Sequence, residues 1–155
     1  MPDSQRERFE VMQWLFWQAA NLGPMAGQLS HFVSYTKEDV PYAHDRYANE
    51  YDRLLAVMEV RLRNRECLAG DYSIADIASF PWILPYRRLG NDLERFPNLH
   101  RWFDALKERP AVRHGIDLGR GWRRSLASEE KARAVMFRQN AATVFAAAKN
   151  LELDP

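Results

Sequence analysis

Cysteine is almost absent from this sequence, with Cys67 as the single one in 155 residues. One thiol cannot build an intramolecular disulfide framework, and it cannot supply a cysteine-rich zinc site. The chain is therefore predicted to work in a reducing compartment, with the cytoplasm as the expected location. Cys67 follows the expected end of a helix, where the helix dipole opposes a thiolate, so an unreactive thiol is favoured over a nucleophile.

Long apolar runs and a dominant charge are also missing. No stretch approaches the roughly 18 consecutive apolar residues of a membrane span, and no early apolar run follows a basic flank. The 22 basic and 21 acidic residues leave a formal net charge of +1. The chain is therefore expected to be neither secreted nor membrane-spanning, and nucleic acid is not predicted as a partner.

Several motifs of catalysis and metal binding are missing too. The four histidines, His31, His44, His100 and His114, have no paired-ligand spacing, so no metal is predicted. Glycine loops for phosphate and nucleophile-elbow sequences do not occur. The sequence is 46% hydrophobic and 28% charged, a composition that is typical of a folded globular domain.

Apolar residues recur at helical spacing, and no segment alternates with period two, so the chain is predicted to be all-α. Ser4 and Glu7 form the capping box of a first helix. Gly23 and Pro24 are expected to kink this helix rather than end it, because the apolar pattern resumes after them. A second helix over residues 41–62 is expected to complete a helical hairpin.

The rest of the chain is predicted to be helical as well. A third, buried and bent helix starts at Ser73 and contains Pro81, and a fourth covers residues 98–109. A short turn is expected at residues 111–114, and Ser128 is expected to cap one final helix. This organisation divides the chain into a helical domain, residues 1–127, and an additional C-terminal helix and tail, residues 128–155.

The segment from Tyr72 to Ile77 has the sharpest local pattern. Ser73 and Asp76 have the spacing of a capping box, and Tyr72 is placed to pack on Ile77 across the turn. Loss of such a cap is expected to cost about 1 to 2 kcal/mol. A general acid or base at Asp76 is the alternative, but the capping spacing already explains the carboxylate structurally.

Aromatic residues crowd the first helix. Trp14, Phe16 and Trp17 project in directions about 100° apart for each successive residue, so they cannot all face the same side of a bundle. Core packing is the usual explanation for any one of them. Together they favour contact with a partner or a ligand, and they predict a dimer or larger assembly.

Arg46 lies one turn into the second helix, among the tyrosines Tyr42 and Tyr47. Its guanidinium has the fork geometry that binds a carboxylate. A surface ion pair with Asp45 or Glu50 is the alternative.

With these residues in view, the sequence resembles the C-terminal domain of glutathione S-transferases, in particular nu-class enzymes with disulfide-bond reductase activity and their yeast prion-regulator relatives. Four segments carry the resemblance in order: Gln13-Trp14-Leu15-Phe16-Trp17-Gln18 with Leu22-Gly23-Pro24-Met25, then Pro41-Tyr42-Ala43 with Arg46-Tyr47, then Tyr72-Ser73-Ile74-Ala75-Asp76-Ile77-Ala78 with Pro81-Trp82, and Phe96-Pro97-Asn98-Leu99 with Trp102 and Arg109-Pro110-Ala111.

This resemblance implies glutathione as a substrate and Arg46 as a glutathione contact. It also implies a homodimer and an apolar pocket for the second substrate, with Trp14, Trp17, Trp82 and Tyr86 as candidate lining. In such enzymes a thioredoxin-like domain comes first and activates the sulfur. The chain begins at the first helix of the second domain, so we expect the thioredoxin-like domain to be absent and assign no catalytic residue.

Two functional classes remain open at this point. The chain is either the C-terminal half of a glutathione transferase, inactive alone and completed by a thioredoxin-like partner, or a stand-alone helical module for binding or dimerisation. In the first class the reaction is attack of a thiol on an electrophile or a disulfide.

Overall fold

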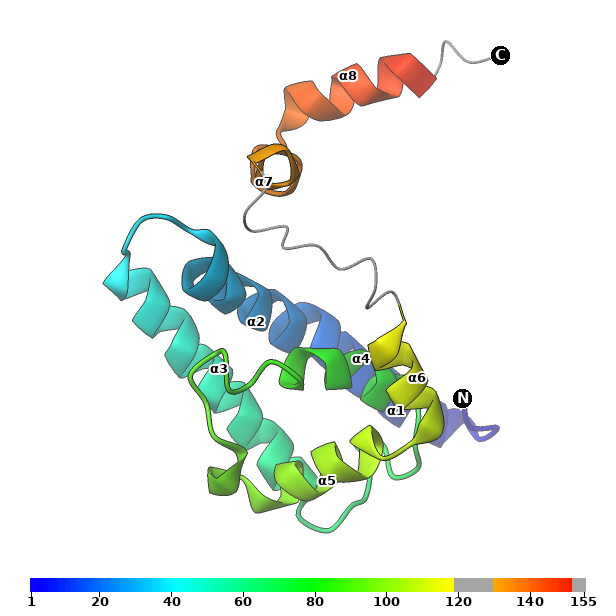
Figure 1. Cartoon of the computed structure of the whole chain (residues 1–155). Helices are drawn as coiled ribbons and strands as arrows, with labels where there is room; N and C mark the ends of the chain where they lie inside the picture. The colour runs from blue at the N-terminus through cyan, green and yellow to red at the C-terminus, as the bar shows by residue number, and fades with distance from the viewer. Residues whose placement is uncertain (119–129, 152–155) are drawn as a thin grey trace. The chain divides into compact units, whose positions relative to one another are not determined.

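A computed structural model describes residues 1–118 and 130–151 (Figure 1). Every regular element in these ranges is a helix, and the strand-like pairing found there is limited to two isolated bridges, Cys67 with Gly70 and Ala69 with Asp71. The all-α prediction is confirmed. The chain divides into two compact units, residues 1–116 and 117–155, and each is described by itself.

The first unit opens with one long run of helical segments. They are α1 (Gln5–Trp17), a π-helical turn (Gln18–Leu22), α2 (Gly23–Ser30) and a second π-helical turn (His31–Tyr35). The Ser4 hydroxyl accepts a hydrogen bond from the Glu7 amide at 3.3 Å. Pro24 has no amide hydrogen for the turn before it, and the wider π-helical turn lies there. The irregularity therefore starts one turn before the predicted kink at Gly23 and Pro24.

The second helix, α3 (Pro41–Leu62), has the predicted bounds and packs against α2 and against a later helix, α5 (Pro97–Lys107). Tyr51, in the middle of α3, is fully buried, and its hydroxyl donates a hydrogen bond to the Trp82 carbonyl oxygen at 3.0 Å. Glu59, one helical turn before the end of α3, accepts hydrogen bonds from the Asn98 and Leu99 amides at 2.9 Å each. Its carboxylate thereby caps α5 from across the bundle.

Between these helices lies α4 (Ile74–Ile83), which contains Pro81. A short 3-10 helix (Leu93–Arg95) precedes α5. The core gathers apolar side chains from every one of these segments. Its largest fully buried members are Trp102, Tyr51, Leu22, Leu29, Leu54, Leu55, Met58, Leu62, Leu68, Ile83, Leu93 and Leu99.

Two expectations about the C-terminal part are wrong. Residues 111–114 belong to a helix, α6 (Pro110–Asp117), rather than to a turn. The expected single last helix is two helices, α7 (Glu130–Phe137) and α8 (Ala141–Leu151). The predicted cap at Ser128 lies outside the described residues.

Candidate functional site

Arg46 lies near the N-terminal end of α3, where its side chain is exposed. Tyr42, four residues earlier on the same side of the helix, is 83% exposed. Among the described residues, the Arg46 guanidinium has no hydrogen-bond or ion-pair partner within bonding distance. The predicted alternative, an ion pair with Asp45 or Glu50, therefore does not form.

The carboxylates beside Arg46 are occupied by other groups. Asp45 contacts the His44 ring at 3.2 Å, and Glu50 forms a two-pronged pair with Arg53 at 2.7 and 2.9 Å. The hydrogen bond from Arg53 lowers the pKa of the Glu50 carboxyl, and the nearby charge of Arg46 lowers this pKa further. Arg46 thus retains a free fork for an external carboxylate.

The aromatic residues of α1 separate onto two sides of the helix. Trp14 and Trp17 are partly buried against the core and meet edge to face, with ring centroids 5.2 Å apart. Phe16 points away from the core and is 64% exposed. The expectation that these three side chains cannot share one face is confirmed.

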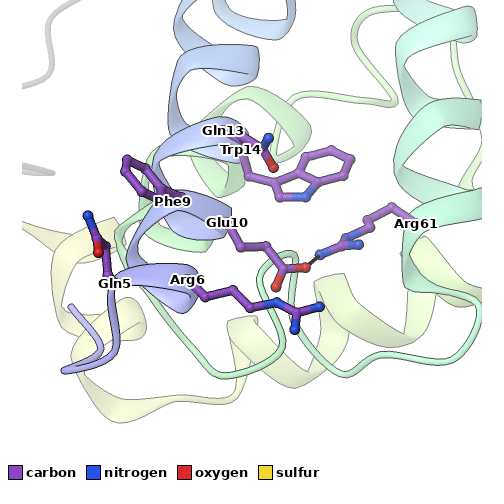
Figure 2. A pocket seen from close by; sticks show the side chains of 7 residues that line it. All are labelled: Gln5, Arg6, Phe9, Glu10, Gln13, Trp14 and Arg61. Atoms are coloured by element: carbon purple, nitrogen blue, oxygen red, sulfur yellow. Dashed lines mark hydrogen bonds and ion pairs between the residues drawn. The ribbon is translucent and has the colours of Figure 1, made fainter.

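An open hollow of about 580 Å3 lies beside Trp14, along α1 (Figure 2). Arg61 reaches into it from α3 and forms an ion pair with Glu10. The same guanidinium donates to the Leu68 carbonyl oxygen at 2.6 Å and lies 5.1 Å from the Trp14 ring centre. The hydrogen bond from Arg61 lowers the pKa of the Glu10 carboxyl.

The Glu10–Arg61 contact was not predicted from the sequence. Its two residues lie on different helices and are 51 positions apart, and no local spacing signals such a pair. The pair ties α1 to α3 and holds the Trp14 ring against a cation. Phe9 projects from α1 away from this pair (Figure 2).

The structure does not place the four predicted pocket residues around one hollow described in residues 1–118. Trp82 is partly buried, and its ring lies over α2, where a Cβ on Gly27 would come within 3.7 Å of it. Tyr86 is 8% exposed and packs edge to face on Phe103, with ring centroids 5.7 Å apart. Trp14 lines the hollow along α1.

The segment before α4 is a buried polar network. Both halves of the Ser73–Asp76 capping box are present. The Asp76 carboxylate, fully buried, also accepts hydrogen bonds from the Leu68 amide and from the Trp102 indole at 2.9 Å each. The Cζ atom of Arg109 lies 3.8 Å from the centre of the Tyr72 ring. Ile77 is 53% exposed. Because these hydrogen bonds occupy the lone pairs of the Asp76 carboxylate, the carboxylate has a structural role.

Cys67 is buried, and burial, with the charge of Asp76 adding to it, raises the pKa of this thiol to about 11. Little thiolate therefore exists at neutral pH, so the expectation of an unreactive thiol agrees with its surroundings. Within the described residues, no three His, Cys, Asp or Glu side chains come together as metal ligands. No helix in the same ranges is long and apolar enough to cross a membrane.

Residues 22–110 match the glutathione S-transferase C-terminal domain, and the chain belongs to this family. The disulfide-bond oxidoreductase YfcG of Escherichia coli K12 is 45% identical over 108 residues, which are 69% of this chain and 50% of that protein. The disulfide-bond oxidoreductase YghU of the same organism is 33% identical over 129 residues, 74% of this chain and 43% of that protein. The resemblance drawn from the sequence motifs is confirmed.

Solved structures agree with this assignment. A glutathione transferase from Burkholderia graminis, with two glutathione molecules bound per subunit, is 38% identical with a TM-score of 0.69, over 76% of this chain and 52% of that one. The transferase URE2P6 from Phanerochaete chrysosporium, in complex with oxidized glutathione, is 34% identical with a TM-score of 0.70, over 77% of this chain and 56% of that one. The chain spans about half the length of the relatives it matches.

Proposed function

We propose that this chain provides the helical half of a cytoplasmic glutathione-dependent enzyme, which either conjugates glutathione to an electrophile or uses it to reduce a disulfide. The observation that carries the proposal is the free guanidinium of Arg46. It lies exposed on α3 in the sequence context of the family's glutathione contact, and the neighbouring carboxylates of Asp45 and Glu50 bond to His44 and Arg53 instead. Its role is to bind one glutathione carboxylate through paired, charge-assisted hydrogen bonds.

The sulfur chemistry belongs to a thioredoxin-like domain, whether that domain is part of the same polypeptide or of a partner. Cys67 is a poor nucleophile because of its raised pKa, and the Asp76 carboxylate is committed to the fold. The helical half contributes binding and orientation, which are the terms that bring the thiol and its target together. The proposed apolar lining for the second substrate remains Trp14, Trp17, Trp82 and Tyr86, of which the three tryptophans are partly exposed. Since the four do not share one hollow in residues 1–118, this proposal requires the thioredoxin-like half to complete the pocket.

The first part of the test uses the chain alone. Glutathione is supplied with a chloronitrobenzene or with a small disulfide, and steady-state turnover is measured. We expect none above the uncatalysed rate, because thiol activation would be missing. Turnover by the chain alone would contradict the assignment of the sulfur chemistry to a thioredoxin-like domain.

The second part joins the chain to the thioredoxin-like half of a glutathione transferase relative. Activity should appear, and Arg46→Ala should raise the KM for glutathione by roughly tenfold or more, as loss of a charge-assisted hydrogen bond does. Arg113→Ala is the control, since Arg113 is an exposed arginine of α6 that pairs with Glu108, and its removal leaves Glu50 and Arg53 unchanged. An active chimera in which both variants behave alike would remove Arg46 from the site. A soluble but inactive chimera would favour a stand-alone binding or dimerisation module.

A further inference from the structure

A second hollow, of about 530 Å3, lies where the end of α3 meets α5, and the proposed glutathione site does not use it. Four arginines line this hollow, and Glu66 is the one acidic residue in the lining. The arginines are Arg63, Arg65, Arg101 and Arg109. We call this feature the arginine hollow. Like charges gathered in this way repel one another unless an anion lies among them.

Arg101 is fixed in place by the fold. Its guanidinium donates hydrogen bonds to the main-chain carbonyl oxygens of Leu62 and Arg65 at 2.7 and 2.8 Å, and to the Asn98 side chain at 3.2 Å. These acceptors are neutral, so the positive charge is held at the hollow without a carboxylate to balance it. A charge fixed in this way needs no reordering when a ligand arrives.

The other three arginines keep their donors available. Arg63 and Arg65 are exposed, and neither guanidinium has a hydrogen-bond or ion-pair acceptor among the described residues. Arg109 lies over the Tyr72 ring, a contact that uses the face of its guanidinium and leaves the N–H groups at its edge free. Glu66 also lines the hollow but lies beyond ion-pair distance of these arginines in the described part of the chain.

One side of the arginine hollow is formed by α5. Ala105, which lies between Arg101 and Arg109 on the same side of α5, is the exposed apolar residue of the lining, whereas Leu106 and Trp102 are 3% and 0% exposed. A volume of this size is typical of sites for small organic ligands. A ligand matched to this lining would carry a concentrated negative charge for the arginines and an apolar group for Ala105 and the aliphatic stems of the arginine side chains.

We propose that the arginine hollow binds a small organic phosphate monoester, with the phosphate among Arg63, Arg65 and Arg109 and the apolar body against α5. Phosphate suits this hollow better than one carboxylate because it brings close to two charges and three acceptor oxygens to several guanidiniums. Arg46 and Arg63 are about 25 Å apart along the helix axis, at roughly 1.5 Å per residue. A glutathione held at Arg46 therefore would not fill the arginine hollow.

The test titrates the full chain by calorimetry at low ionic strength with three probes: 1-naphthyl phosphate, inorganic phosphate and 1-naphthol. The aromatic phosphate should bind at least about tenfold more tightly than either of the others, because it alone carries both a phosphate for the arginines and an apolar group for Ala105. Raising the salt concentration should weaken its binding. Equal affinities for the aromatic phosphate and for naphthol would overturn the proposal, since the arginines would then contribute nothing.

Variants locate the binding. The double variant Arg63→Gln/Arg65→Gln should weaken the binding of 1-naphthyl phosphate by about tenfold or more. The control Arg87→Gln/Arg88→Gln removes the same charge from an exposed pair outside the hollow, and it should change the affinity little. Ala105→Glu, which adds a carboxylate to the lining, should also abolish binding. Circular dichroism checks that each variant is folded. If the two double variants lose affinity equally, the effect is one of net charge, and the site does not exist.

Discussion

At the scale of single residues, Asp76 shows how a buried carboxylate can serve the fold. Its oxygens accept hydrogen bonds from Leu68 and Ser73, in the connection before α4, and from Trp102 of α5. Replacing Asp76 with alanine leaves these donors without partners in the core, and each such loss costs about 1 to 3 kcal/mol. We expect Asp76→Ala to lower the free energy of unfolding by about 3 kcal/mol or more, measured by chemical denaturation.

Asp92 provides the control for this prediction. It is an exposed cap whose carboxylate accepts the Glu94 amide at 3.0 Å, and Asp92→Ala should cost about 1 kcal/mol or less. If the two variants lose similar amounts of unfolding free energy, Asp76 acts as a simple cap. The estimate of 1 to 2 kcal/mol drawn from the sequence counted the cap alone, because the spacing of Ser73 and Asp76 is local. The Trp102 contact, 26 residues away, depends on the packing of α5 and leaves no local signal.

At the scale of the helices, predictions succeeded where the pattern is local and regular. Pro41 and the apolar periodicity after it fix α3 from end to end. The turn predicted at residues 111–114 is wrong because proline can either follow a helix or begin one, and Pro110 begins α6. Val112 and Ile116, four residues apart, pack on the core and offset the low helix propensity of Gly115.

The predicted single last helix is two helices because Asn140 caps a second helical start within it. The Asn140 side chain accepts hydrogen bonds from the Ala142 and Thr143 amides at 2.9 and 3.2 Å, and the Thr143 hydroxyl accepts the Asn140 amide at 2.9 Å. This reciprocal arrangement starts α8 at Ala141. The signal was present in the sequence, since asparagine followed three residues later by threonine can cap in both directions. The first π-helical turn also has a signal in Pro24, which predicts an irregularity without its type, whereas the second, His31–Tyr35, contains no proline or glycine.

The glycines around α2 offer a paired test of that packing. A Cβ at Gly23 would lie 2.8 Å from the side-chain nitrogen Nε2 of Gln18 and 3.3 Å from the Trp82 ring. A Cβ at Gly27 would lie 3.7 Å from the same ring, which is an ordinary contact. Gly27→Ala should therefore leave stability unchanged or raise it by up to about 1 kcal/mol, because alanine favours the helix. Gly23→Ala should be destabilising by about 1 to 3 kcal/mol, because the buried Gln18 side chain and the partly buried Trp82 ring must shift.

Thermal and chemical denaturation of both variants measures this difference. If Gly23→Ala is as stable as Gly27→Ala, the side chains around the π-helical turn rearrange freely, and the close approach of Trp82 does not constrain the first helix. The comparison needs no absolute stability, since both substitutions add the same methyl group to the same helical run.

At the scale of the whole molecule, the motifs were sufficient to identify the family, because they lie in helices whose order the family shares. The arrangement of the candidate site was harder to predict from the sequence. Arg46 could be singled out from its sequence context, but its lack of a partner depends on Glu50 pairing with Arg53. The arginine hollow joins the end of α3 to α5 across residues 63–109, and no single window of sequence contains that juxtaposition.

Association is the property of the whole molecule that the surface of α1 predicts. Phe9 and Phe16 are 61% and 64% exposed and lie two turns apart on one side of the helix, while Val60 of α3 is 62% exposed. Covering about 200 Å2 of such surface contributes about 5 kcal/mol at roughly 25 cal/mol per Å2. We expect a dimer or larger species at micromolar concentration, measured by sedimentation velocity.

Variants locate the interface of this dimer. The double variant Phe9→Ser/Phe16→Ser should shift the protein to the monomer. Val144→Ser/Phe145→Ser, which changes an equally exposed apolar pair on α8, should not. A wild-type chain that sediments strictly as a monomer would contradict self-association, and loss of the dimer in the α8 variant alone would assign the interface to the C-terminal unit.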